Sequence, residues 1–311
     1  MTLLTKKIAI IDLGTNTFHL LVAALHVEGY KIVYEERLPA KIGMAGINNG
    51  VITPEAISRA IGVLKGYRQT VDEMGVEETL AFGTSAIRSA QNQLEVISKI
   101  KEATGFAVKV ISGEEEADYI YRGVRAAVPL GHQKSLIVDI GGGSVEFIIA
   151  NESQVFWKQS FEIGGQRLLE RFQKHDPILP DEITSLQLYL AEQLQPLLMA
   201  LKEHKPKIVV GSSGTFDTLS EIHCYRNGIV FEQMPETPLT LQAIDEIYEE
   251  LLLKNRAERM LIPGMIELRV DMIVVACSLI DFLLKSHAFE KVRVSSYSLK
   301  EGVLQELSTQ H

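Results

Sequence analysis

SLIVDIGGGSVEFIIA, residues 135–150, is the stretch from which the fold of this chain can be read. One apolar run leads to Asp139, three consecutive glycines follow at 141–143, and a second apolar run leaves them. Short apolar runs bounded by glycine are typical of buried strands, here joined in a hairpin. Glycines let backbone N–H groups approach a ligand closely, and clustered N–H groups bind anions. The stretch predicts an anion-binding turn flanked by Asp139 and Glu146, where a carboxylate can hold a metal or orient a water. The alternative is an ordinary β-turn that contains an aspartate.

The same pattern occurs once more near the N-terminus, in IAIIDLGTNTFHLLVA at residues 8–23. The aligned pairs are Asp12 with Asp139, Gly14 with Gly141, Thr17 with Ser144, and His19 with Glu146. A repeat of this kind indicates two related half-molecules, each with one phosphate-holding hairpin. Two such loops facing each other across a cleft would grip a phosphate chain from both sides.

Length and composition indicate a soluble globular protein. The chain has 311 residues, 46% hydrophobic and 23% charged, which fits one large or two ordinary domains. Its net charge of −9 argues against non-specific nucleic-acid binding and against an anionic membrane surface. Cys224 and Cys277 have no paired spacing, as expected for reduced thiols in the cytoplasm. We see no signal-peptide pattern. The apolar run 272–284 is too short to span a bilayer; we expect core, with a homodimer interface as the alternative.

Strand and helix patterns alternate up to Ala127 and predict an α/β domain. We expect a boundary at 128–131, which gives domains 1–127 and 128–297, with a C-terminal helix near 298–311 packing on the first. Helix N-caps are expected at Thr53 and Thr240. The other expected elements are strands at 30–38, 79–82, 107–111, 154–162, 208–210 and 292–296, and helices at 86–102, 112–127, 166–172, 182–204, 269–284 and 301–306.

Two arginines follow small-residue turns. Arg88 comes after the Gly-Thr-Ser turn at 83–85, in the first turn of the helix expected at 86–102. A cation is unfavourable at a helix N-terminus, so Arg88 predicts a phosphate contact there; the alternative is a solvated surface arginine. Arg167 follows Gly164 and Gly165 in the same way, and a plain turn is its alternative.

One glutamate stands out as a candidate general base. Ser112 and Glu115 have capping-box spacing. Glu116 lies about 100° round the helix from Glu115, next to the apolar-face residue Ala117. A carboxylate at that edge can act as a general base, although acids at a helix start are also common without any such role.

Other catalytic patterns are missing from the sequence. Its histidines lack zinc-ligand spacing, and there is no GxSxG, no Cys/His nucleophile pattern and no GxxxxGK[ST]. Carboxylates, glycine-rich loops and arginines remain, and they suit metal-assisted phosphoryl transfer to water or to another acceptor.

Together these motifs resemble the exopolyphosphatase / guanosine pentaphosphate phosphohydrolase (Ppx/GppA) family over essentially the whole chain. The matching segments, in order, are IDLGTNTFHLLV (11–22), GTSAIRSAQN (83–92), VISGEEEADYIYRGV (110–124), VDIGGGSVEF (138–147), IGGQRL (163–168), GSSGT (211–215), IPGMIELRVDMI (262–273) and SLKEGVL (298–304). Eight motifs in the right order make the resemblance specific.

The resemblance implies two ribonuclease-H-like α/β domains of the actin/Hsp70/sugar-kinase architecture, with the site in the cleft between them. It implies hydrolysis of terminal phosphates from inorganic polyphosphate or from guanosine pentaphosphate. Within the family pattern Glu116 is the general base, Asp139 and Glu146 serve a divalent metal such as Mg²⁺ and the water, and Arg88 is a phosphate ligand. The remaining expected phosphate-binding residues are Asp12, Gly14, Thr15, Asn16, Gly141, Gly142, Gly143, Ser144, Arg167 and Arg269.

Three features depart from the family pattern. Lys300 replaces the usual arginine of an R-E-G motif, so a bidentate contact becomes a point charge. Asp118 replaces another arginine. Longer members carry extra C-terminal helical domains, and their absence here favours short polyphosphate chains. Guanosine pentaphosphate is the alternative substrate, and a kinase of the same fold or a non-catalytic sensor of guanosine tetra- or pentaphosphate is the alternative from another class.

Overall fold

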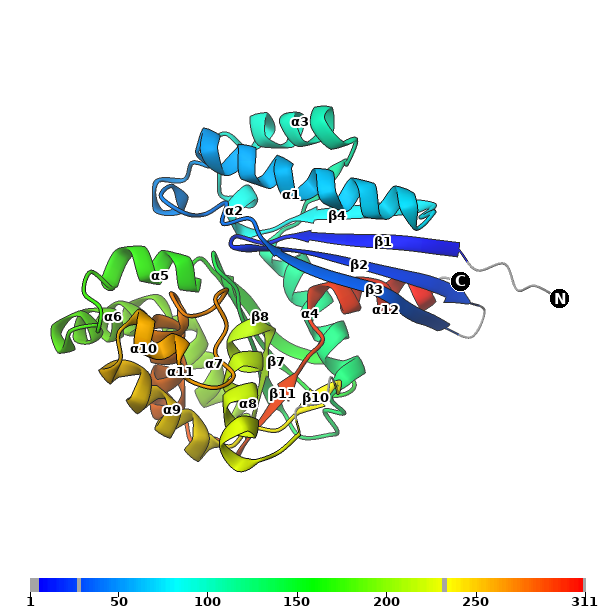
Figure 1. Cartoon of the computed structure of the whole chain (residues 1–311). Helices are drawn as coiled ribbons and strands as arrows, with labels where there is room; N and C mark the ends of the chain where they lie inside the picture. Colours follow the sequence, from blue (N-terminus) through cyan, green and yellow to red (C-terminus); the bar gives the residue numbers. More distant parts are fainter. Residues whose placement is uncertain (1–5, 27–28, 231–233, 310–311) are drawn as a thin grey trace. The chain divides into compact units, whose positions relative to one another are not determined.

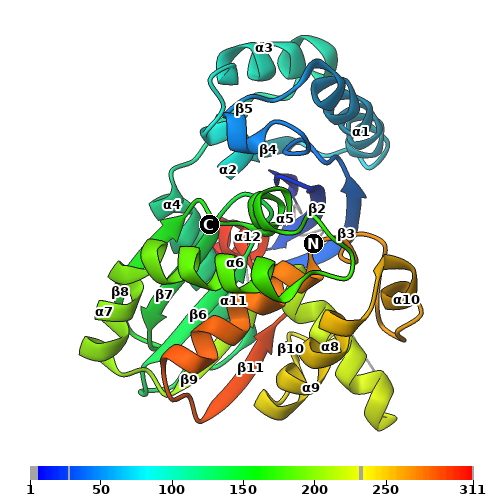
Figure 2. The ribbon, with the colours of Figure 1, turned by 90° about the vertical axis from the view of Figure 1, so that its left-hand side faces the viewer.

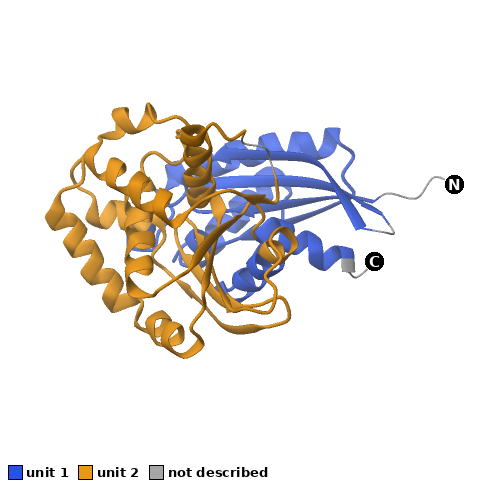
Figure 3. Ribbon diagram, turned by 90° about the horizontal axis from the view of Figure 1, so that it is seen from below, with its two compact units in different colours: residues 1–122, 299–311 blue, residues 123–298 orange. Residues whose placement is uncertain are grey.

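The computed structural model describes residues 6–26, 29–230 and 234–309 (Figure 1). The chain divides into two compact units (Figure 3). Unit 1 comprises Met1–Arg122 and Leu299–His311, and unit 2 comprises Gly123–Ser298.

Unit 1 contains a five-stranded sheet in the order β3-β2-β1-β4-β5. Its strands are β1 (Lys6–Leu13), β2 (Thr17–His26), β3 (Gly29–Pro39), β4 (Glu78–Gly83) and β5 (Val108–Val110). Its helices are α1 (Pro54–Glu73), α2 (Ser85–Arg88), α3 (Gln93–Thr104), the first part of α4 (Gly113–Ala127) and α12 (Leu299–Thr309), with a 3₁₀ turn at Ile47–Asn49. In Figure 1, α1 and α3 lie above the sheet and α12 lies below it, against β1 and β3.

Unit 2 contains a six-stranded sheet in the order β10-β11-β9-β6-β7-β8. Its strands are β6 (Ser135–Ile140), β7 (Val145–Ala150), β8 (Val155–Phe161), β9 (Ile208–Ser212), β10 (Glu236–Thr237) and β11 (Lys291–Ser295). Its helices, besides the end of α4, are α5 (Gly165–Phe172), α6 (Pro180–Gln193), α7 (Gln195–His204), α8 (Ser213–Asn227), α9 (Leu241–Leu253), α10 (Arg256–Met260) and α11 (Ile273–Ser286). Helix α11 packs among α5, α6, α8 and α9 (Figure 2).

The two sheets repeat one topology. Without its edge strand β10, the second sheet reads β8-β7-β6-β9-β11, which matches β3-β2-β1-β4-β5 strand for strand. In each sheet three antiparallel strands are followed by two parallel ones. This is the ribonuclease-H-like arrangement. The predicted fold class, α/β with two such halves, is therefore confirmed.

Local capping signals form as the sequence predicts. The hydroxyl of Thr53 accepts a hydrogen bond from Ala56 N at 3.2 Å, and that of Thr240 accepts one from Ala243 N at 3.1 Å. Glu115 N donates to Ser112 Oγ at 3.1 Å while Ser112 N donates back to the Glu115 carboxylate at 2.9 Å, which completes the capping box.

The single helix predicted at 86–102 is wrong, because the structure has two helices there, α2 and α3. The residues between them pair with the loop that precedes α1. Gln91 N donates to Gly50 O at 2.8 Å, and Asn92 exchanges side-chain hydrogen bonds with the backbone of Ile52. At residues 91 and 92 these bonds to a distant segment take the place of the i→i−4 hydrogen bonds that one continuous helix would need.

The long helix predicted at 182–204 is likewise divided, into α6 and α7, at Leu194. Pro196 lies in the first turn of α7. Because proline has no N–H and its ring collides with the preceding turn, it ends one helix and starts the next.

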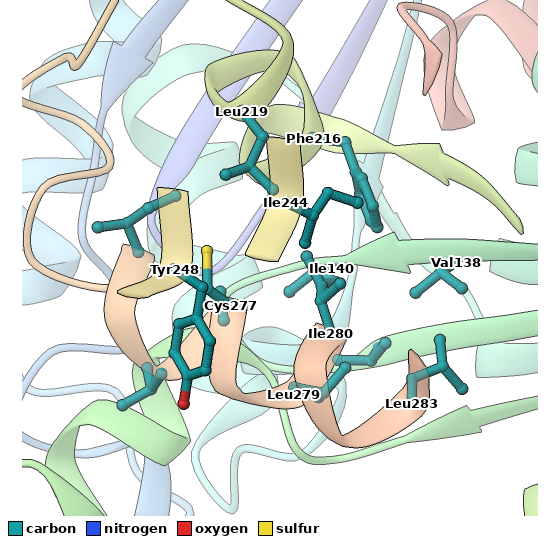
Figure 4. Packing of buried hydrophobic residues seen from close by; sticks show 14 of the residues in the cluster. Val138, Ile140, Phe216, Leu219, Ile244, Tyr248, Cys277, Leu279, Ile280 and Leu283 are labelled. Carbon is teal, nitrogen blue, oxygen red and sulfur yellow. The ribbon is translucent and has the colours of Figure 1, made fainter. Parts of the chain in front are cut away.

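The core of unit 2 is built on one face of its sheet. Figure 4 shows Phe216 and Leu219 of α8 and Ile244 of α9 packed with side chains of α11 against Val138 and Ile140 of β6. Every residue of α11 from Ile273 to Asp281 is buried. The apolar run 272–284 is therefore core, as predicted, although its helix begins at Ile273 rather than near residue 269. No helix in the described ranges is both long and apolar enough to cross a membrane.

Helix α12 joins unit 1 through a close approach to α4. Gly302 faces the backbone of Tyr119, and a methyl group at 302 would overlap the Tyr119 carbonyl oxygen. The absence of a side chain at 302 thus lets the last helix of the chain dock on a segment that lies far away in sequence.

We expect Gly302→Ala to lower the free energy of unfolding by about 2 kcal/mol or more, because a backbone overlap must be relieved by moving a helix. Urea unfolding followed by circular dichroism measures this change. Gly62→Ala in the middle of α1 is the control, since nothing lies within 4 Å of a methyl group there. The control should gain up to about 1 kcal/mol. Equal stability of both variants would contradict the proposed docking constraint.

Candidate active site

The β6–β7 hairpin brings Asp139 and Glu146 together. The two residues are direct cross-strand partners, so their side chains leave the same face of the sheet with Cβ atoms about 5 Å apart. Both are buried. Glu146 accepts a hydrogen bond from Ser160 Oγ at 2.6 Å, and Asp139 accepts one from the Ser298 hydroxyl. The structure thus pairs the two carboxylates that the sequence singled out.

Burial raises the pKa of Asp139. Hydrogen bonds from Ser298, Ser212 and Ser213 and the positive charge of Arg269 act in the opposite direction and do not cancel it. A buried carboxylate with a raised pKa favours a proton or a cation beside it.

The donor set fits Mg²⁺. This ion usually takes one or two protein carboxylates and completes its shell with water and substrate phosphate oxygens. Asp139 and Glu146 supply two such carboxylates on one sheet face. Within residues 6–26, 29–230 and 234–309 there is no group of three or more His, Cys, Asp or Glu side chains that could form an all-protein cage.

The loop at 141–144 is held by its carbonyl groups. Three consecutive amides at the start of α5 donate to three consecutive loop carbonyls. These bonds are Gly165 N to Gly141 O at 2.9 Å, Gln166 N to Gly142 O at 2.8 Å and Gly164 N to Gly143 O at 3.1 Å. In a planar trans peptide the N–H points opposite to the carbonyl. The N–H groups of residues 142–144 therefore point away from α5.

This orientation gives the loop the geometry of an anion-binding nest. None of the hydrogen bonds within the described part of the chain uses the N–H groups of residues 142–144. Gly164 is required for the close fit, because a methyl group there would overlap the backbone of residues 142–143. Successive amides that face one direction bind phosphate oxygens well. The helix start that the sequence suggested as a phosphate contact is instead occupied by the loop.

The loop at 14–16 in unit 1 is held in the same manner by a different segment. Gly43 N donates to Thr15 O at 3.0 Å, and the amides of Ala40 and Lys41 both donate to Asn16 O, at 2.9 and 2.8 Å. Asp12, which precedes the loop, is the direct cross-strand partner of His19, as Asp139 is of Glu146. The aligned residues of the sequence repeat thus occupy equivalent places.

Arg88 and Glu116 form an ion pair in unit 1. They follow β4 and β5, and the loop at 14–16 follows β1, so all three come after the carboxyl ends of parallel strands. Arg88 Nη1 lies 2.7 Å from Glu116 Oε2, and the side chains are only 18% and 10% exposed. Arg88 Nη1 also donates to Ile111 O at 3.3 Å. Arg88 is the last residue of the one-turn helix α2 and does not lie at the N-terminus of a helix over 86–102, so the helix dipole gives no reason to expect a phosphate there. The ion pair with Glu116 accounts for the position of Arg88.

Arg269 is buried beside the glycine loop of unit 2. It lines a small pocket together with Gly141, Gly142 and Thr215. Its guanidinium lies against Gly214, where a methyl group would overlap it. Its positive charge also lies near enough to Asp139 to lower the pKa of that carboxyl.

The segment that carries Arg269 is fixed by an arginine that sequence reasoning missed. Arg259 is 1% exposed; its Nη1 contacts Asp176 Oδ1 at 2.7 Å and its Nε donates to Val270 O at 3.3 Å. The hydroxyls of Ser160, Ser212, Ser213 and Ser298 were also missed. A signal was present for three of them, since Ser212 and Ser213 lie in the GSSGT motif and Ser298 begins the SLKEGVL motif. Ser213 adopts a positive φ of 73°.

Lys300, the departure from the family pattern, is largely buried in unit 1. Its ammonium pairs with the Glu301 carboxylate and lies 3.4 Å from Glu35 Oε1. Burial lowers the pKa of Lys300, but the two carboxylates outweigh burial and raise it above the ordinary value. In this structure Lys300 neutralises carboxylates.

Comparison with known proteins gives one consistent family. The model described as "Ppx/GppA phosphatase family" matches residues 21–311. The chain is 44% identical to an exopolyphosphatase from Cytophaga hutchinsonii of known crystal structure, with a TM-score of 0.94 over 98% of each chain. It is 26% identical to the Aquifex aeolicus member of the Ppx/GppA family, with a TM-score of 0.76 over 98% of each chain.

A third relative is a Vibrio cholerae guanosine-5'-triphosphate,3'-diphosphate pyrophosphatase. It is 29% identical over 301 residues, which cover 96% of this chain and 59% of that protein.

We expect Asp139→Asn to stabilise the metal-free protein near neutral pH. A raised folded-state pKa means that the wild type loses stability as pH rises above 3.8, the ordinary value for aspartate, whereas the neutral amide does not. A pKa raised by one unit corresponds to about 1.4 kcal/mol. Urea unfolding in EDTA between about pH 4 and pH 8 tests this.

The gain of Asp139→Asn over wild type should grow with pH and vanish at the acid end. Asp181→Asn, an exposed position on α6, is the control and should show no gain. A variant less stable than wild type at every pH would refute the argument from burial.

Proposed function

Because this chain belongs to the Ppx/GppA phosphatase family, we propose that it is a phosphoanhydride hydrolase that releases terminal phosphate from inorganic polyphosphate. The observation that carries the proposal is the loop at 141–144. Its amides face one way beside the carboxylates Asp139 and Glu146. An amide nest next to cation ligands suits a phosphate chain, which brings both anionic oxygens and bound metal.

Glu116 is the proposed general base. It accepts a proton from the attacking water as the oxygen of that water bonds to the terminal phosphorus. The bond from phosphorus to the bridging oxygen breaks, and a chain shortened by one phosphate leaves. The proton on Glu116 then passes to solvent. In this proposal Arg88, whose Nη1 lies 2.7 Å from Glu116 Oε2, also holds an oxygen of the transferred phosphoryl group.

The remaining proposed roles follow from the direction of the loop amides and from the charges of the side chains. The amides of residues 142–144 hold phosphoryl oxygens, and the loop at 14–16 is a second phosphate contact. Arg269 neutralises charge on a neighbouring phosphate. Asp139 and Glu146 would hold Mg²⁺, which when bound neutralises charge on the phosphoryl oxygens.

Guanosine pentaphosphate is the second candidate substrate. The relative from Vibrio cholerae, which bears the name of a guanosine pentaphosphate hydrolase, aligns with 96% of this chain. Both substrates present a terminal phosphoanhydride, so the roles proposed above serve either one.

We expect Glu116→Gln to lower kcat by about 10²–10⁴, the usual loss for a general base, with the fold retained. Steady-state phosphate release and thermal melting measure the two quantities. Glu114→Gln is the matched control, since Glu114 is an exposed glutamate in the same turn. Turnover of Glu116→Gln equal to that of the control would remove Glu116 from the mechanism.

We expect phosphate release from polyphosphate with Mg²⁺ and its loss in EDTA. The assay compares short polyphosphate, long polyphosphate and guanosine pentaphosphate at equal terminal-phosphate concentration. Preference for the nucleotide would support the second candidate. No release from any of them by the folded protein would favour a kinase or a sensor over a hydrolase.

A further inference from the structure

Arg167 lies on the carbonyl side of the loop at 141–144. It projects from the first turn of α5, and its side chain is 13% exposed. Its Nε donates to Gly143 O at 2.8 Å, and its Nη2 donates to Glu162 Oε2 at 2.8 Å. The guanidinium therefore contacts a carbonyl and a carboxylate, on the side of the loop opposite to its N–H groups.

The contact with Gly143 acts on the next amide. The carbonyl of Gly143 and the N–H of Ser144 belong to one planar peptide, so holding the carbonyl fixes the direction of that N–H. Two donors, Gly164 N and Arg167 Nε, converge on this oxygen. A charged donor polarises the peptide, which makes the opposite N–H a stronger donor to an anion.

Unit 1 contains a corresponding arginine behind its own loop. Arg59 on α1 donates from Nη2 to Lys41 O at 2.8 Å and from Nε to Ala40 O at 3.4 Å. The amides of Ala40 and Lys41 in turn hold Asn16 O. Lys41 has a positive φ of 45°, a conformation that a residue with a side chain adopts only when its surroundings hold it.

We propose that Arg167 and Arg59 are positioning residues that keep the amide sides of the two loops turned toward the ligand. Arg167 acts directly on Gly143 O, whereas Arg59 acts through residues 40–41, whose amides hold Asn16 O. The inference rests on the proposed function for what the ligand is. The contacts of Arg167 favour this role over the direct phosphate contact that the sequence suggested, because Gly143 O draws its guanidinium to the side of the loop opposite to the N–H groups.

The first test is Arg167→Ala. Loop amides stabilise the transferred phosphoryl group most in the transition state, so their misalignment should lower kcat by about 10-fold and change KM by less than about threefold. Arg167→Lys, which keeps the positive charge and a donor group but loses the planar fork of the guanidinium, should recover part of kcat. The control Arg171→Ala removes the same charge from the same helix at an exposed residue that stacks on Tyr189 at 4.2 Å, and it should retain wild-type kinetics.

Glu162→Gln distinguishes a direct phosphate contact of Arg167 from a positioning role, because the two predict opposite changes in KM. If Arg167 bound phosphate directly, loss of the competing carboxylate would free its guanidinium and lower KM. If Arg167 positions the loop, KM should stay the same or rise. A lower KM for Glu162→Gln, or a rise in KM without a change in kcat for Arg167→Ala, would overturn the proposal.

Hydrogen exchange tests the same inference without any activity. The amides of residues 164–166, which donate to the loop carbonyls, should exchange at least about threefold faster in Arg167→Ala than in wild type or Arg171→Ala. The amides of Ala40, Lys41 and Gly43, which donate to the loop at 14–16, should do so in Arg59→Ala but not in Arg68→Ala. Arg68 is on the same helix as Arg59 and pairs with Asp72 instead. Unchanged exchange in Arg167→Ala and Arg59→Ala would overturn the proposal.

The two readouts also separate this inference from the proposed function. If the wild type released no phosphate while the amides at 164–166 exchanged faster in Arg167→Ala, the substrate assignment would be refuted and the positioning role would stay supported.

Discussion

Three hydrogen bonds from the first amides of α5 to the carbonyls of residues 141–143 are the interaction on which the site in unit 2 depends. A loop of three glycines has many conformations, and by itself it has no preferred direction for its N–H groups. The three bonds select one conformation, because the N–H of each planar peptide points opposite to the carbonyl that α5 holds. Helix α5 is in turn held against α11. The hydrophobic core therefore sets the direction of the anion-binding amides.

A second constraint is the burial of charge. Asp139 and Glu146 lie side by side with little access to water, which is unfavourable for two carboxylates. Hydroxyls from three serines and the nearby Arg269 reduce the cost at Asp139 without removing it. The unfavourable pairing supports the proposed cation site, because proteins commonly give up stability where function requires it.

Because the two units share one topology, residues at equivalent positions of their hairpins can be compared directly. In both hairpins an aspartate precedes a loop whose carbonyls accept hydrogen bonds from amides of another segment. Opposite that aspartate, unit 2 has Glu146 and unit 1 has His19. Only the first pairing gives two adjacent carboxylates. Unit 1 has instead the Arg88–Glu116 ion pair.

The sequence by itself determined the features that depend on near neighbours. The hairpins, the caps at Thr53, Ser112 and Thr240 and the repeated loops follow from residues a few positions apart. The division of the helix predicted at 182–204 was also readable, since Pro196 is a local signal. Only the tertiary structure decided the break at 89–92, which depends on bonds to residues 50–52. It also placed Ser298 on Asp139, 159 positions away. Sequence patterns cannot assign such contacts, because which polar group reaches which partner is settled only when the core has packed.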